Sequence, residues 1–170
     1  MSLQESHERV SSNKPPVGRR SSGFPPRSRV LIVDDIAENR MVLAMFCEQF
    51  GVSCESVEGG HEAVQAASSG RFDAILMDIF MPRMDGMIAT MAIRALAEPA
   101  RSTPIIAVTT ACEPGDVQRY LACGMNDAVA KPILAARLME ALSTALAERK
   151  RALRASRTRT ETALAIPLTA

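Results

Sequence analysis

Hydrophobic residues in the middle of the chain alternate between two kinds of segment. Short apolar runs, several of them rich in β-branched residues, occupy residues 30–33, 53–57, 74–77, 105–108 and 128–130. Between them, apolar residues recur with a helical period near 37–49, 60–69, 87–97, 114–123 and 133–150. Strands that alternate with helices predict a parallel sheet with helices on both faces. The pattern therefore predicts a doubly wound α/β domain with five parallel strands.

Details of the pattern support this prediction. The run at 30–33 is apolar throughout, as in strands that are buried on both faces. Breakers such as Gly51 and Gly124 separate the segments, and Pro114 suits the first turn of a helix. In the first helix we expect one apolar face, made of Met41, Leu43, Ala44, Phe46 and Cys47.

The two ends of the chain differ from the middle. Residues 1–28 are rich in Ser, Pro, Arg and Gly, which predicts a disordered, solvated tail. Residues 29–148 form the predicted domain, and 149–170 read as a basic helix end followed by a C-terminal tail. We expect no second domain, so that any output would depend on docking.

Composition excludes several classes of function. The formal net charge is +1, and there is no Trp and one Tyr, so we expect no direct binding to nucleic acid. The four cysteines form no CxxC pair and only two histidines exist, which argues against zinc and favours reduced cysteines. Neither a membrane span nor a signal peptide is expected, which predicts a cytoplasmic location.

Polar residues follow the predicted strands. Asp34 and Asp35 come after the first run, Asp78 after the third, and Lys131 after the fifth. The fourth run is followed by Thr109 and Thr110. Ligands of open α/β sheets bind outside the carboxyl ends of the strands. The sequence therefore predicts that three carboxylates, a hydroxyl and an ammonium group meet at one edge.

This set of groups suits phosphoryl transfer. Three crowded acids repel one another, and Mg²⁺ relieves that repulsion by binding carboxylates, water and a phosphate oxygen. A carboxylate can act as the nucleophile and form an acyl phosphate, while Lys131 offers a point charge to the phosphoryl group. Taken alone, an Asp pair after a strand is often a helix cap, and a Lys-Pro pair is usually a loop entry. Their joint placement at consecutive strand ends favours the functional interpretation.

Four segments of the chain, LIVDD (31–35), ILMDIFMPRMDG (75–86), PIIAVTT (104–110) and AKPI (130–133), resemble the signature motifs of response-regulator receiver domains. The resemblance covers about residues 29–148 and is nearest in style to receivers of hybrid histidine kinases, given MPRMDG and the pair Asn39–Arg40. It implies a flavodoxin-like (βα)5 receiver fold.

The resemblance also implies roles for single residues. Asp78 corresponds to the phosphoacceptor, and Thr109 and Lys131 to the residues that contact the phosphoryl group. Asp34 and Asp35, with Asp78 and the backbone carbonyl of Phe80, correspond to the Mg²⁺ ligands, and Mn²⁺ is expected to substitute. The implied donor is a histidine kinase or a histidine phosphotransfer protein, and the implied output is docking to a downstream protein whose identity the sequence does not give.

The chain departs from the family pattern at several positions. Ala128 stands where an aromatic residue that rotates on activation is common, and Thr110 stands where Ala is usual. We therefore expect a switch region at Thr109, Thr110 and Ala128 that works without an aromatic flip. Phe80 and Ala111 flank the expected water path and cannot hydrogen-bond a water, which predicts slow loss of the phosphoryl group.

Asp85 and Gly86 resemble the turn after the acceptor loop, where Gly86 would permit an unusual backbone angle.

One alternative function is that of a phosphatase or phosphotransferase with an aspartyl intermediate. Such enzymes usually carry a second Asp two residues after the nucleophile, where this chain has Phe80. The other is a receiver-like domain that does not signal by phosphate.

Overall fold

The strands form one parallel sheet, as the hydrophobic pattern predicts. The computed structural model describes residues 28–164, and side chains up to residue 156. The strand order is β2-β1-β3-β4-β5, with every neighbouring pair parallel. Each predicted run agrees with a strand to within one residue at either end: β1 Arg29–Val33, β2 Ser53–Val57, β3 Ala74–Met77, β4 Ile105–Thr109 and β5 Asp127–Ala130.

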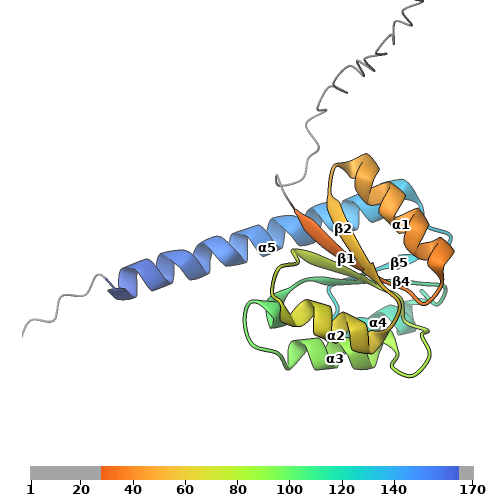
Figure 1. Cartoon of the computed structure of the whole chain (residues 1–170), viewed down its shortest axis with the longest axis horizontal. Coiled ribbons are helices and arrows are strands. Elements are labelled where there is room, and N and C mark those ends of the chain that lie inside the picture. The colour runs from red at the N-terminus through yellow and green to blue at the C-terminus, as the bar shows by residue number, and fades with distance from the viewer. Residues whose placement is uncertain (1–27, 165–170) are drawn as a thin grey trace, which may run out of the picture.

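Helices cover both faces of this sheet, in two layers that Figure 1 shows. One face carries α1 (Ala37–Phe50) and α5 (Ala135–Leu164), and the other carries α2 (Gly60–Ser68), α3 (Gly86–Arg94) and α4 (Pro114–Ala122). A short 3-10 helix, η1 (Ala100–Ser102), precedes β4. The doubly wound α/β architecture is therefore confirmed.

The core is divided by the sheet into two clusters. Successive side chains of a strand point to opposite faces, so Val30 and Ile32 of β1 pack toward α1 and α5, whereas Leu31 and Val33 pack toward α2 and α3. All four side chains have no exposed surface. The apolar run at 30–33 is thus a central strand that needs both helical layers.

The first helix buries a narrower face than the sequence predicts. Leu43, Cys47 and Phe50 are buried, whereas Met41 is 65% exposed. The expectation that Met41 shares the core-facing stripe is wrong, because the buried residues follow a spacing of three and four that excludes it. Met41 lies instead on the outer surface of α1.

The last helix is longer than predicted and runs away from the sheet (Figure 1). It begins at Ala135 and ends at Leu164, whereas the sequence pattern predicts a helix over 133–150. No Gly or Pro occurs from 133 to 166, so nothing in this stretch interrupts a helix. Arg149 is only 3% exposed, which places it against the domain beyond the predicted boundary at 148.

At the N-terminus, the predicted disordered tail lies outside the described residues, except for Ser28. Ser28 is buried, and its carbonyl accepts hydrogen bonds from the backbone amide and the hydroxyl of Ser53, at 3.1 and 2.9 Å. Ser28 therefore belongs to the packed domain. Within residues 28–164, no helix is both long enough and apolar enough to cross a membrane.

Candidate functional site

Three carboxylates meet at the carboxyl edge of the sheet. Asp34 and Asp35 follow β1, and Asp78 follows β3, which pairs with β1 directly. One ligand atom from each of the three lies within 4.8 Å of the others. Oxygen donors at this spacing are what Mg²⁺ prefers, and three acids suit a hard divalent cation. The residues present therefore fit the predicted metal, although the structure does not test Phe80 as a further ligand.

Asp34 is held more tightly than the other two acids. It has no exposed surface, and its Oδ1 accepts hydrogen bonds from the Ile36 amide at 2.9 Å and from Asn39 Nδ2 at 3.0 Å. Arg40 Nη1 donates to the Asp34 backbone carbonyl at 2.8 Å. Asp35 accepts no hydrogen bond from any described residue and is half-buried. Asp35 is thus the more available ligand, while Asp34 is oriented by the protein.

Lys131 links the two buried acids. Its Nζ lies 2.7 Å from Asp34 Oδ2 and 3.2 Å from Asp78 Oδ2, and its side chain is only 15% exposed. Burial raises the pKa of Asp78, an effect that Lys131 partly offsets and that the neighbouring Asp34 reinforces. The ammonium group therefore sits where it can neutralise charge on a group attached to Asp78.

The backbone around Asp78 is closely packed. The Asp78 amide donates to Val33 O at 2.8 Å, and Asp78 Oδ1 accepts from the Ile79 amide at 2.8 Å. A Cβ at Gly86 would lie 2.1 Å from the Asp78 carbonyl oxygen. The expectation that Gly86 supplies an unusual backbone angle is wrong, because its φ is not among the positive ones of the described residues. Glycine is required at position 86 because a side chain would not fit there. Asp85 is the N-cap of α3, and its side chain accepts a hydrogen bond from the Ile88 amide.

Of the predicted switch residues, Thr109 and Ala128 lie on strands and Thr110 follows β4. Thr109 ends β4 and has no exposed surface, whereas Thr110 is exposed. Thr109 Oγ1 accepts a hydrogen bond from the Ala111 amide at 3.3 Å. Ala128, on β5, is 8% exposed. Thr109 is thus buried at the end of β4, the strand next to β3, whereas Thr110 is exposed.

Phe80 lies on the surface near the acceptor. It follows Asp78 by two residues and is 60% exposed, while Ala111 is half-buried. That Phe80 and Ala111 slow the loss of the phosphoryl group from Asp78 stays a prediction.

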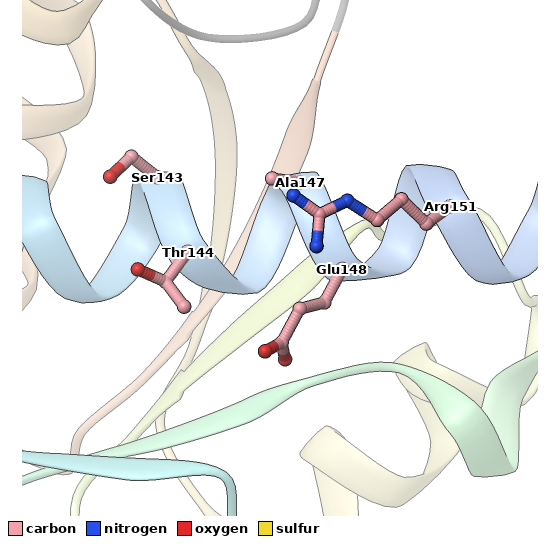
Figure 2. Close-up of a pocket in the computed structure, with 5 residues that line it drawn as sticks. All are labelled: Ser143, Thr144, Ala147, Glu148 and Arg151. Carbon is pink, nitrogen blue, oxygen red and sulfur yellow. The ribbon is translucent and has the colours of Figure 1, made fainter.

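A separate depression lies on α5 and does not include the acidic cluster. Figure 2 shows its five lining residues, which all belong to this one helix: Ser143, Thr144, Ala147, Glu148 and Arg151. No second element contributes a wall. We therefore place the functional site at the sheet edge and not at this depression.

The family can be named from these observations and from sequence comparison. The model of the response regulator receiver domain matches residues 30–143. This chain belongs to the receiver domain family. Solved receiver domains share its fold, so the predicted recognition and the flavodoxin-like (βα)5 fold are confirmed.

Relatives of this chain include sensor kinases. The sensor protein GacS of Pseudomonas syringae is 43% identical over 115 residues, which cover 64% of this chain and 13% of GacS. The histidine-protein kinase BarA of Escherichia coli is 40% identical over 109 residues, covering 64% of this chain and 12% of BarA. The receiver therefore spans about an eighth of these curated relatives, and it resembles one part of a hybrid kinase.

Solved structures give the same assignment. A receiver domain of a sensor histidine kinase from Pseudomonas aeruginosa, with magnesium coordinated in its active-site cleft, is 38% identical with a TM-score of 0.66, covering 71% of this chain and 98% of that one. The receiver of the yeast response regulator Ssk1, solved with the histidine phosphotransfer protein Ypd1, is 29% identical with a TM-score of 0.61, covering 68% and 85%.

Two residues that hold the acidic cluster, and one residue outside it, were not assigned roles from sequence. Asn39 and Arg40 hold Asp34, although the sequence marked them only as part of the family likeness. Their spacing of five and six residues after Asp34 places them in the first turn of α1, which is a usable signal. Tyr120 lies under the β4–α4 connection, and no sequence motif indicates that position.

Proposed function

We propose that this receiver accepts a phosphoryl group on Asp78 from a phosphohistidine and displays it to a protein partner. One observation carries the proposal: Asp34, Asp35 and Asp78 form a cation-sized cluster, with Lys131 bridging two of them. Asp35 and Asp78, with Asp34 and the Phe80 carbonyl, would hold Mg²⁺. When bound, Mg²⁺ would neutralise charge on the phosphoryl oxygens.

The chain's own residues supply the remaining chemistry. An Asp78 carboxylate oxygen forms the new P–O bond while the P–N bond to the donor imidazole breaks, and the electron pair of that bond stays on the imidazole nitrogen. Lys131 and the Thr109 hydroxyl bind the phosphoryl oxygens in the product. The donor contributes the leaving group, so the receiver needs no general acid of its own.

The direct test of the proposal is labelling with acetyl phosphate, followed by intact mass. We expect about one phosphoryl group per chain with Mg²⁺, none with EDTA, and recovery with Mn²⁺, since both ions accept oxygen ligands. Asp78→Asn should abolish labelling. Glu58→Gln, which alters an exposed acid after β2, is the matched control and should label fully. Full labelling of Asp78→Asn would exclude Asp78 as the acceptor.

The same experiment separates the alternatives. A stable stoichiometric adduct supports a switch with slow autodephosphorylation, whereas repeated turnover of acetyl phosphate supports a phosphatase. No adduct at all would favour a domain that does not signal by phosphate. We propose the switch, because the position two residues after Asp78 carries the apolar Phe80 and no second acid.

We also propose that the donor is a histidine kinase or a histidine phosphotransfer protein. The support is the yeast complex of Ypd1 with the Ssk1 receiver, together with the kinase relatives. On this chain, α1 begins beside the acidic cluster and exposes Met41 and Met45 by 65% and 64%. Exposed apolar side chains next to the site suit contact with a protein donor.

A further inference from the structure

The only tyrosine of the chain is buried beneath the connection between β4 and α4. Tyr120 is 2% exposed and is the one buried residue of α4. Its hydroxyl donates a hydrogen bond to the Ala111 carbonyl at 2.9 Å. A buried phenol needs such a partner. The bond therefore ties the interior face of α4 to the connection that leaves the functional site.

The tie continues to the end of β4. The Ala111 amide donates to Thr109 Oγ1 at 3.3 Å, and the nearby Thr109 side chain lowers the pKa of the Tyr120 phenol. Burial is the larger effect and raises the pKa of Tyr120, so the phenol stays protonated and remains a donor at neutral pH. Thr109, Ala111 and Tyr120 thus form one continuous polar link within an apolar surrounding.

On β5, the strand next to β4, only a small side chain packs in the cluster that holds Tyr120. Ala128 of β5 belongs to the same buried cluster as Tyr120, together with Ala107 and Met125. The side chain of Ala128 is a single methyl group and offers no hydroxyl. The aromatic hydroxyl in this cluster is therefore carried by α4 and not by β5.

We propose that Tyr120 couples the phosphorylation state of Asp78 to the position of α4, an inference that rests on the proposed function. Asp78 and Thr109 end neighbouring strands, since Met77 lies opposite Ala107 in the sheet. A phosphoryl group adds strong acceptor oxygens beside Thr109. The bond from the Ala111 amide is long, so little opposes the rotation of the Thr109 hydroxyl toward those oxygens.

That rotation has consequences along the link. The Ala111 amide loses its acceptor, and the connection from Thr110 to Glu113 rearranges to satisfy it. Because the Ala111 carbonyl accepts a hydrogen bond from the Tyr120 hydroxyl, the rearrangement reaches α4 through the phenol. The expected change is therefore a rearrangement of the connection between β4 and α4 together with a shift of α4, which is a common form of switching.

The first test uses the intrinsic fluorescence of the whole chain. With one Tyr and no Trp, tyrosine emission reports on Tyr120 alone. We expect a change in emission when acetyl phosphate and Mg²⁺ label the chain, and none in Asp78→Asn. Labelling of the wild type without any change in emission would overturn the coupling while leaving the proposed function intact.

The second test removes the hydroxyl and keeps the ring. Tyr120→Phe should label to full stoichiometry, but the phosphorylation-dependent change in amide exchange over 110–122 should fall at least twofold. Leu121→Ala, which shortens an exposed side chain of the same helix, is the control and should keep the full change. An undiminished change in Tyr120→Phe overturns the coupling. A wild-type chain that does not label overturns the proposed function, and the coupling with it.

Discussion

Asp78 is a single residue whose surroundings oppose its charge. It is 6% exposed, and burial together with Asp34 raises its pKa above the ordinary value, despite Lys131. The folded chain therefore binds a proton at Asp78 more readily than the unfolded chain does. The stability that this proton contributes is fully present below the unfolded pKa and is lost as pH rises through the folded pKa.

The first prediction follows from the raised pKa of Asp78 in the folded chain. Without divalent cations at pH 7, Asp78→Asn should be more stable than the wild type, because a neutral side chain removes the buried charge. The advantage should shrink as pH falls toward the ordinary pKa of 3.8, where Asp78 becomes neutral in both states. Urea unfolding in EDTA at pH 7 and near pH 4 measures it. A variant that is less stable at pH 7 would show that Lys131 dominates over burial.

Phe80 carries the second prediction at the residue scale. If its exposed ring blocks water from the phosphorylated Asp78, Phe80→Asn should shorten the lifetime of the phosphoryl group by about tenfold, at the low end of what water positioning contributes. Timing the loss by intact mass without any partner checks this. Met139→Asn, at an exposed apolar residue of α5, should leave the lifetime unchanged. An equal lifetime in both variants would show that Phe80 does not guard the site.

Among the elements, α1 presents a surface as well as a core face. Met41 and Met45 lie four residues apart and are both exposed, whereas Leu43 and Cys47 face the sheet; Ala44 packs partly against the core. The packing of Cys47 is deep enough to raise the pKa of its thiol to about 12. The helix therefore divides into an inert inner face and an apolar outer one.

A charge on the outer face should separate two kinds of phosphodonor. Met45→Glu should slow transfer from a phosphorylated histidine phosphotransfer protein, since the apolar contact is lost, and should leave labelling by acetyl phosphate unchanged. Met91→Glu, at a similarly exposed methionine of α3, should affect neither reaction. Rates from both donors, followed by phosphate-sensitive gels, give the comparison. Equal slowing with both donors would mean that Met45 matters only for the fold.

The start of α3 depends on the absence of a side chain. Gly86→Ala would bring a Cβ to 2.1 Å from the Asp78 carbonyl, so the acceptor loop must shift. We expect this variant to lose several kcal/mol of stability, on the order of a severe core change, and to label poorly. Thermal unfolding and labelling measure the two effects.

Gly115 in α4 provides the matched control for Gly86. A Cβ there meets nothing within 4 Å, and Gly115 is helical. Gly115→Ala should therefore stabilise the chain by about 0.4–1 kcal/mol, through the reduced entropy of the unfolded state. Two alanine substitutions in helices should thus have opposite signs. Similar stabilities for the two variants would contradict the close approach at Gly86.

For the whole molecule, the extent of α5 matters most. Arg149 is buried on the domain, where its Nη2 donates to the Pro99 carbonyl at 2.8 Å and its Nη1 donates to Ser102 Oγ. Its Nε has no partner among the described residues. The helix is therefore anchored to the segment before β4 by a residue that lies outside the predicted domain of 29–148.

Two truncations test this anchor. A chain that ends after residue 156 should keep its stability within about 0.5 kcal/mol, because the removed residues lie beyond the anchor. A chain that ends after 148 should lose about 1–3 kcal/mol, since buried acceptors lose their donor. Urea unfolding compares both with Arg151→Ala, an exposed control. Equal stability of the two truncated chains would support the boundary at 148.

The sequence alone determined the strands and the acids that follow them. Hydrophobic period is a local property, so β1 and β3 were predictable to within one residue, and parallel order then brings Asp34 and Asp78 to one edge. The family likeness added the roles that we expect of Thr109 and Lys131. These predictions needed no knowledge of how the loops pack.

Only the tertiary structure decided which residues support that site. Asn39 reaches Asp34 because the first turn of α1 lies beside that acid, and Gly86 is needed because the start of α3 approaches the Asp78 carbonyl. Tyr120 meets Ala111 because α4 packs on β5. None of these approaches repeats along the chain, so no sequence pattern encodes them. Distances between loops depend on the packing of whole helices against the sheet, which the sequence specifies only through the complete fold.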